Sequence, residues 1–99
     1  MDKDVIDLSE YAKTNGDREL PKGQKYKFKV KNQVYIVDVE QMTGRDICIM
    51  ADLIPPENYI LDMKMHGGVM REVKLDEVIS FIKPGIENFT YVARSQTEG

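Results

Sequence analysis

Residues 43–54 read TGRDICIMADLI, and this stretch has the spacing of a helix with one apolar face. Thr43 can accept a backbone N–H, and Asp46 follows three residues later, where a carboxylate favours the positive end of a helix. The pair Pro55-Pro56 stops the helix. Side chains on the apolar stripe recur every three or four residues, at Ile47, Met50, Ala51 and Ile54. The sequence therefore predicts a helix over residues 43–54.

Two alternating segments precede this helix. Residues 25–31 alternate three apolar side chains with four lysines, which predicts a half-buried strand. A tight turn at Asn32-Gln33 leads into a second predicted strand, residues 34–40. The inward side chains of this second strand are Tyr35, Val37 and Val39. Val34 and Ile36 then lie on the outer face, where they are exposed contact candidates.

The four lysines of residues 25–31 raise the question of nucleic-acid binding. No aromatic side chains alternate with them on that face to stack bases, and the chain carries a formal net charge of −3. We interpret the lysine face as a solvated surface that discourages edge-to-edge pairing of strands.

Three more strands and a short helix are predicted after residue 55. Residues 59–65 alternate, His66-Gly67-Gly68 turns the chain, and residues 69–75 form the next strand. Residues 76–82 predict one or two helical turns capped by Asp76, and the last strand covers residues 89–93. The predicted order is strand, strand, helix, strand, strand, short helix, strand, which is an α+β fold with a mixed sheet packed on one helix.

Length and composition bound the class of protein. Ninety-nine residues, 41% hydrophobic and 31% charged, predict one soluble globular domain. The single Cys48 cannot form an internal disulfide, which favours a reducing cytoplasm. No apolar run approaches the ~20 residues of a membrane span, so we expect no membrane as partner. The formal net charge of −3 does not favour nucleic acid either.

The two ends of the chain differ from its middle. Residues 1–23 are rich in polar side chains and breakers, so we predict a flexible N-terminal arm. The alternative is an arm that docks on a partner through Ile6, Leu8 and Tyr11. Residues 94–99 contain no bulky apolar side chain and are predicted to be a flexible tail after a folded domain at residues 24–93. The tail ends in glycine, which can pass through clefts too narrow for other residues.

No arrangement of residues typical of an enzyme is present. Cys48 lies inside the apolar helix without a nearby histidine or basic cluster, so we expect a buried packing residue. His66, the only histidine, has no nucleophile beside it in sequence and is expected to be an exposed turn residue. Metal-ligand spacing is absent. We therefore predict no catalytic residue, no metal site and no enzyme activity.

The order of elements resembles the ubiquitin-like β-grasp fold. The residues that carry this resemblance are Val37-Asp38-Val39-Glu40 before the Thr43-capped helix, Ile54-Pro55-Pro56-Glu57 after it, and Leu61 in the third strand. The chain also resembles the bacterial multiubiquitin-type domains of bacterial ubiquitination-like (Bub) operons. The shared landmarks are Thr43-Gly44-Arg45-Asp46-Ile47, His66-Gly67-Gly68 and Gly85-Ile86-Glu87-Asn88-Phe89.

This resemblance implies a protein modifier of a bacterial ubiquitination-like, antiphage-type pathway. Its C-terminal Gly99 would be adenylated by an E1-like enzyme and passed to an E2-like enzyme as a thioester or oxyester, and then to a target protein. A processing peptidase would trim residues beyond the glycine. ATP would be used by the activating enzyme, and the chain itself would hold no cofactor. The residues read by the E1-like enzyme and the peptidase would be Arg94, Ser95, Gln96, Thr97 and Glu98.

Two positions depart from ubiquitin. The chain ends in Glu98-Gly99 in place of Gly-Gly, and Asp62 stands where ubiquitin's recognition patch has an isoleucine. Because a carboxylate is costly to bury in an apolar pocket, ordinary ubiquitin receptors are not expected to bind. A different partner surface is predicted from strand parity, made of Val34, Ile36, Ile60, Asp62 and Met70.

Two alternatives to a conjugated modifier stay open. The first is a sulfur carrier, a β-grasp protein whose tail becomes a thiocarboxylate; such proteins typically end in Gly-Gly, so Glu98 counts against it. The second is a β-grasp interaction module that is never conjugated. A ferredoxin is excluded because one cysteine cannot hold an iron–sulfur cluster.

Overall fold

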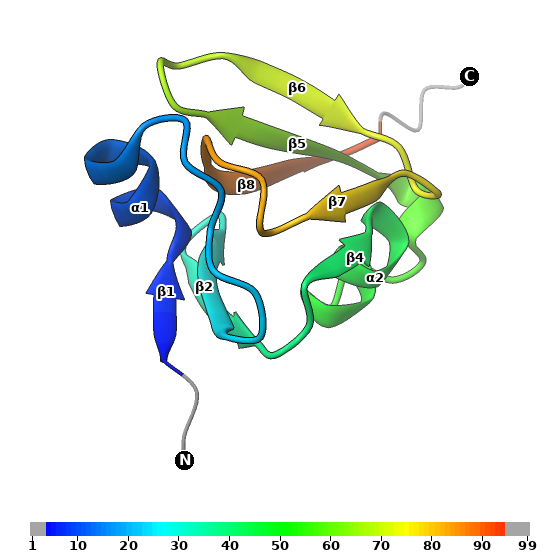
Figure 1. Ribbon diagram of the computed structural model, residues 1–99. Coiled ribbons are helices and arrows are strands. Elements are labelled where there is room, and N and C mark those ends of the chain that lie inside the picture. Colours follow the sequence, from blue (N-terminus) through cyan, green and yellow to red (C-terminus); the bar gives the residue numbers. More distant parts are fainter. Residues whose placement is uncertain (1–3, 95–99) are drawn as a thin grey trace.

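A computed structural model describes residues 4–94 as an α+β fold, in agreement with the predicted class (Figure 1). A mixed six-stranded sheet, a two-stranded sheet and two α-helices make up these residues. The elements in chain order are β1 Val5–Asp7, α1 Leu8–Asn15, β2 Lys25–Val30, β3 Gln33–Val37, β4 Gln41–Thr43, α2 Gly44–Met50, the 3₁₀ helix η1 Pro56–Asn58, β5 Tyr59–Met65, β6 Met70–Val73, β7 Val78–Ser80 and β8 Ile86–Ala93.

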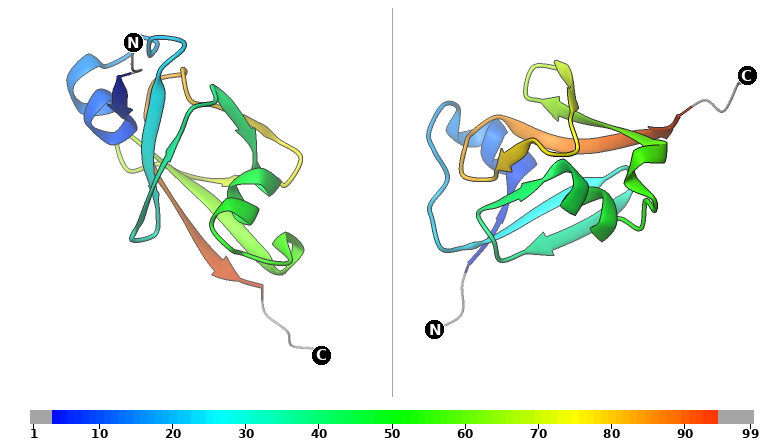
Figure 2. Two further views of the ribbon diagram at one scale, coloured as in Figure 1. Left: turned by 90° about the horizontal axis from the view of Figure 1, so that it is seen from below. Right: turned by 90° about the vertical axis from the view of Figure 1, so that its right-hand side faces the viewer.

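The main sheet is organised around β2 and β8. These two strands run parallel and meet at Val30 and Phe89, with β3 antiparallel to β2 on one side. On the other side β5 is antiparallel to β8, and β6 is antiparallel to β5. Chain segments far apart in sequence therefore form the centre of the sheet, while the hairpins form its margins (Figure 2). The small sheet pairs β4 with β7.

The core lies on the inner side of the main sheet. Phe28 stacks on Phe81 with ring centroids 5.0 Å apart and meets the edge of Phe89 at 5.4 Å. Ile47 and Cys48 of α2 are completely buried in the same cluster. The alternation in residues 25–31 and 59–65 predicted the inward side chains of β2 and β5 correctly. Each buried residue of these strands is followed by a more exposed one.

The helix α2 has the predicted start and an earlier end. Thr43 accepts the N–H of Asp46 while the Asp46 carboxylate accepts the N–H of Thr43, so the capping box is formed. The helix stops at Met50, and Asp52 takes a positive φ of 63°. The predicted stripe therefore fails at Ile54, which is 60% exposed beyond the end of the helix.

Residues 4–23 correct the prediction of a flexible arm. β1 pairs in parallel with Lys25–Lys27, and the Asp7 carboxylate caps α1 by accepting the N–H groups of Ser9 and Glu10. Because β2 is paired with β8 only at Val30, the two strands diverge, and α1 packs against both of them. The side chains that the segment buries are Leu8, Ala12 and Leu20. The segment is therefore part of the folded domain, and the boundary predicted at residue 24 is wrong.

Residues 76–82 and 38–40 differ from their predicted structure. Val78–Ser80 is the strand β7 and not a helical turn, because it pairs with β4 and directs Ile79 into the core. The second strand ends at Val37, so Val39 is 45% exposed instead of inward. The short helix found after α2 is the 3₁₀ helix η1 (Pro56–Asn58), which precedes β5 and not the last strand.

Glu77 orders the turn between β6 and β7. Its carboxylate accepts the N–H of Lys74 at 3.1 Å and a guanidinium N–H of Arg71 at 2.7 Å. These bonds, first the one from the Lys74 backbone, hold the pKa of Glu77 below its ordinary value of 4.5. Since the folded-state pKa is the lower one, the carboxylate stabilises the fold above the ordinary pKa, and this contribution is lost as the pH falls through the folded-state pKa.

We expect Glu77→Gln to lower the free energy of unfolding by about 1 kcal/mol at neutral pH. The variant should also lose less stability than the wild type when the pH is lowered to about 3. Urea unfolding followed by circular dichroism at both pH values measures the two differences. Equal acid sensitivity of the two proteins would contradict this role, and Glu72→Gln, at an exposed carboxylate of β6, is the control.

Candidate functional site: the end of strand β8 and the outer face of the sheet

The end of β8 is fixed to the 3₁₀ helix η1. The backbone N–H of Arg94 donates to the carbonyl of Asn58 at 2.8 Å, and its Nε donates to the carbonyl of Glu57 at 3.0 Å. Arg94 is exposed and is the last described residue. The predicted tail residues Ser95, Gln96, Thr97 and Glu98 and the predicted conjugation residue Gly99 lie outside the described residues. Arg94 therefore ties the end of β8 to η1 at the surface of the protein.

The anchor extends to the helix α2 through Glu57. The Glu57 carboxylate accepts a guanidinium N–H of Arg45 at 2.7 Å, and this bond lowers the pKa of Glu57 and raises that of Arg45. Both side chains are about half exposed, at 58% and 47%, so solvent screens the pair and its effect on stability is small. Its consequence is geometric, because it links α2 to the segment that holds Arg94.

Aromatic side chains lie beside this anchor on β5 and β8. Tyr59 meets the edge of Tyr91 with ring centroids 5.9 Å apart, and Lys31 Nζ lies 4.4 Å from the Tyr91 ring centroid. A cation over an aromatic face is attracted by the ring quadrupole. Lys31, Arg45 and Arg94 thus place three cations near the end of β8, together with the carboxylate of Glu57.

The predicted partner surface falls on one face of the sheet but not in one patch. Strand register places all five residues outward, with Val34, Ile36 and Met70 exposed at 44%, 54% and 49%, and Ile60 and Asp62 half-buried. The outward lysines of β2 separate the β3 residues from the group on β5 and β6.

Sequence reasoning missed one residue of this outer face. Val92 is 54% exposed and lies directly opposite Ile60, while Asp62 lies opposite Thr90 and Glu72. The signal was present, because Phe89 and Tyr91 point inward and parity then places Val92 outward. The outer face around Asp62 is therefore mixed, with aliphatic side chains beside a carboxylate pair.

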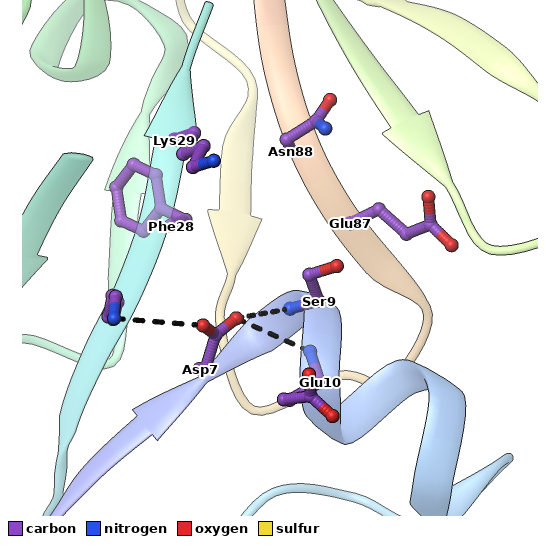
Figure 3. Close-up of a pocket in the computed structure, with 8 residues that line it drawn as sticks. Asp7, Ser9, Glu10, Phe28, Lys29, Glu87 and Asn88 are labelled. Atoms are coloured by element: carbon purple, nitrogen blue, oxygen red, sulfur yellow. Dashed lines mark hydrogen bonds and ion pairs between the residues drawn. The ribbon is translucent and has the colours of Figure 1, made fainter. Parts of the chain in front are cut away.

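A small hollow opens between α1, β2 and β8 (Figure 3). Its volume is about 170 Å³, and Asp7, Lys27 and Glu87 are among the charged residues that line it. The Asp7 carboxylate is engaged by Ser9 and Glu10 of its own helix and lies 3.9 Å from Lys27 Nζ. The polar groups around Asp7 therefore serve the attachment of α1.

Cys48 and His66, the two residues considered for catalysis, lie in different environments: one is buried in the core and the other is exposed in a turn. Cys48 is fully buried, as predicted, and burial raises the pKa of its thiol. His66 Nδ1 lies 3.1 Å from Glu87 Oε2, with Lys64 Nζ 3.8 Å from the other oxygen of that carboxylate. His66 is exposed in a turn, as predicted.

We expect the Cys48 thiol to stay unreactive toward Ellman's reagent in the native protein and to react completely in denaturant. Burial removes access and disfavours the thiolate, which is the reactive form. Ile49→Cys is the matched control, because residue 49 is the neighbouring helix position and is 50% exposed. Native wild-type protein that reacts as fast as the added cysteine would contradict the buried position.

Among residues 4–94, no helix is long and apolar enough to cross a membrane. The same residues contain no group of three or more histidine, cysteine, aspartate or glutamate side chains placed to hold a metal ion. In comparisons with known proteins, no family model, no curated protein and no solved structure matches the chain.

Proposed function

We propose that this protein is a ubiquitin-like modifier with a β-grasp fold, joined to its targets through Gly99. The strand order β3-β2-β8-β5-β6, with a central parallel pair and α2 following the first hairpin, supports the β-grasp assignment. The segment β1–α1 and the small sheet of β4 and β7 are additions to the predicted arrangement.

The anchored end of β8 is the observation that carries the proposal. A modifier must deliver a carboxylate into the active sites of other proteins while a rigid body supplies the binding area. Arg94 is held by Asn58 and Glu57, and five residues follow it in the sequence. A short segment that starts from a fixed point gives its terminal carboxylate a high effective concentration once the body is bound.

The reaction follows the sequence of steps that the family resemblance implies. The Gly99 carboxylate attacks the α-phosphate of ATP on an E1-like enzyme, which releases pyrophosphate and forms an acyl-adenylate. A nucleophile of the enzyme displaces AMP, and the acyl group passes to an E2-like enzyme and then to the target. Where residues extend beyond Gly99, a peptidase exposes the same carboxylate. The chain supplies the electrophile and the binding surface, and it acts in the cytoplasm.

The outer face supports selective recognition. Asp62, beside Glu72 and Thr90, places a carboxylate among the exposed aliphatic side chains of β5, β6 and β8. A receptor with a purely apolar pocket would have to desolvate this carboxylate, which is unfavourable without a cationic partner. We therefore assign the enzymes of this pathway a polar or basic complement to Asp62.

A non-conjugated interaction module is the second candidate, because Val34, Ile36 and Val92 are exposed aliphatic residues on sheet strands. The sulfur-carrier alternative shares the fold and differs in the chemistry of the C-terminal carboxylate.

Intact mass spectrometry separates these functions. The chain is incubated with ATP and the E1-like enzyme of the same organism, with and without a sulfur donor. The proposed function predicts an AMP adduct or an enzyme-linked ester that hydroxylamine cleaves. Exchange of one oxygen for sulfur would identify a carrier, and an unchanged chain beside a reactive control modifier would favour the interaction module.

A further inference from the structure

The helix α1 ends at the pair Asn15-Gly16, where the chain turns away from the helix. Asn15 is the last residue of α1, and Gly16 follows it with a φ of 57° and a ψ of −121°, outside the helical region. Gly16 is exposed, and a Cβ built on it would meet nothing within 4 Å. The backbone at this joint therefore has open space around it. Of the asparagines in the sequence, Asn15 is the only one that a glycine follows.

The side-chain amide of an asparagine can react with the backbone nitrogen of the next residue. That nitrogen gives up its proton and attacks the side-chain carbon Cγ; a C–N bond forms, and the amide nitrogen leaves as ammonia. Water then opens the five-membered cyclic imide at either carbonyl, which gives aspartate or isoaspartate. A following glycine favours the attack, because it has no side chain to crowd the nitrogen and its backbone is the least restricted. Asparagine is one of the thermolabile residues of proteins.

We propose that Asn15 is a site of spontaneous covalent modification, at which the chain loses ammonia and becomes an isoaspartate joined to Gly16. The Asn15 amide is not held by the core, because its Nδ2 donates to the Thr14 hydroxyl of the same helix at 2.9 Å in an exposed hydrogen bond. Such a bond leaves the amide free to turn toward the Gly16 nitrogen. The inference goes beyond the proposed function and does not rest on it.

The other asparagines of the chain lie where the same attack is hindered. The residues that follow them are Gln33, Tyr59 and Phe89, and each of these belongs to a strand. The N–H of Tyr59 donates to the carbonyl of Pro56, and Phe89 is completely buried. A bulky following residue and a backbone held in a strand both raise the barrier to ring closure. These three positions therefore serve as internal references: Asn32, Asn58 and Asn88.

The modification would alter the joint that follows α1. In isoaspartate the main chain runs through the side-chain carbon, so a methylene is added between residues 15 and 16, and the former backbone carbonyl becomes a carboxylate. In the unmodified chain that carbonyl accepts the N–H of Arg18 at 3.2 Å and closes the turn after the helix. A negative charge at the C-terminal end of a helix is also unfavourable. We therefore expect the modification to weaken the attachment of residues 4–23.

Ageing of the full chain in mildly alkaline buffer at physiological temperature tests the site. Peptide mapping by mass spectrometry should find the exchange of –NH₂ for –OH more than about tenfold faster at Asn15 than at the other asparagines, because its barrier is lower. A protein isoaspartate methyltransferase with its methyl donor should label the aged wild type. Asn15→Gln should stay unlabelled, because glutamine would have to close a less favoured six-membered ring. The matched control Asn32→Gln should age like the wild type.

The effect on the attachment of α1 is measured on the isoaspartate form after its separation by ion exchange. This form should unfold at a lower urea concentration than freshly prepared Asn15→Asp, which adds the charge without the methylene. Labelling of Asn15→Gln as fast as the wild type, or a change that maps first to another asparagine, would overturn the site. An isoaspartate form as stable as Asn15→Asp would overturn the weakened attachment of residues 4–23.

Discussion

Replacing Gly44 with alanine is expected to lower the free energy of unfolding by about 3 kcal/mol. A Cβ at this buried position would collide with the carbonyl oxygen of Lys74 and lie 3.0 Å from Val73 Cγ1. The obstacle is backbone, and it is held in place because Gly44 and Arg45 donate their N–H groups to the carbonyls of Glu77 and Leu75. The gain in helix propensity from alanine, about 1 kcal/mol, does not offset this.

Thermal unfolding measures the effect of Gly44→Ala as a fall in Tm of about 10–20 °C. Gly68→Ala is the matched control, because nothing lies within 4 Å of its Cβ and only its positive φ of 88° is strained. The control should lose about 1 kcal/mol. Equal losses for the two variants would mean that α2 is not seated against the turn after β6 as described.

Leu8→Ala is expected to destabilise the protein by about 3 kcal/mol. Leu8 is 2% exposed and packs in the cluster that contains Tyr26 and Phe28. Removing its side chain leaves a cavity where β2 and β8 diverge. The two strands cannot move together to fill this cavity, because β1 is paired with β2. A solvated arm would instead tolerate this change without loss.

Urea unfolding at neutral pH checks the prediction for Leu8. Val5→Ala removes a smaller side chain that is 50% exposed on β1, and it should change stability by less than about 0.5 kcal/mol. If Leu8→Ala behaves like Val5→Ala, residues 4–23 do not belong to the folded unit.

Local signals in the sequence were sufficient for part of the fold. The strands Lys25–Val30 and Tyr59–Met65 follow from strict alternation, because a half-buried strand needs only a period of two. The start of α2 follows from the capping chemistry of Thr43 and Asp46. These features depend on neighbours within a few residues of each other.

The missed elements depend on partners far away in the chain. Val78–Ser80 fits a helical turn or a strand equally well by its apolar pattern, and the pairing of Ile79 with Met42 decides in favour of a strand. Residues 4–23 gave no periodic signal, because Leu8 and Leu20 are separated in sequence and are buried only where β2 and β8 diverge. Pairing across the fold overrides local propensity in both cases.

In the candidate site, too, features set by nearby residues could be predicted and features set by distant residues could not. Strand parity placed Val34, Ile36 and Met70 correctly on the outer face. The anchor of Arg94 could not be predicted, because its partner Glu57 lies 37 residues earlier in the chain. The link from Glu57 to Arg45 likewise depends on how η1 packs beside α2.

The central claim, that Gly99 is the reactive end of a modifier, is tested most directly by one paired mass measurement. The full chain and a variant lacking Gly99 are each mixed with ATP and the E1-like enzyme, and their intact masses are compared. The proposed function predicts that the full chain alone gains AMP or becomes ester-linked to the enzyme, while circular dichroism shows the same fold for both. Equal behaviour of the two chains, whether both react or neither does, would contradict it.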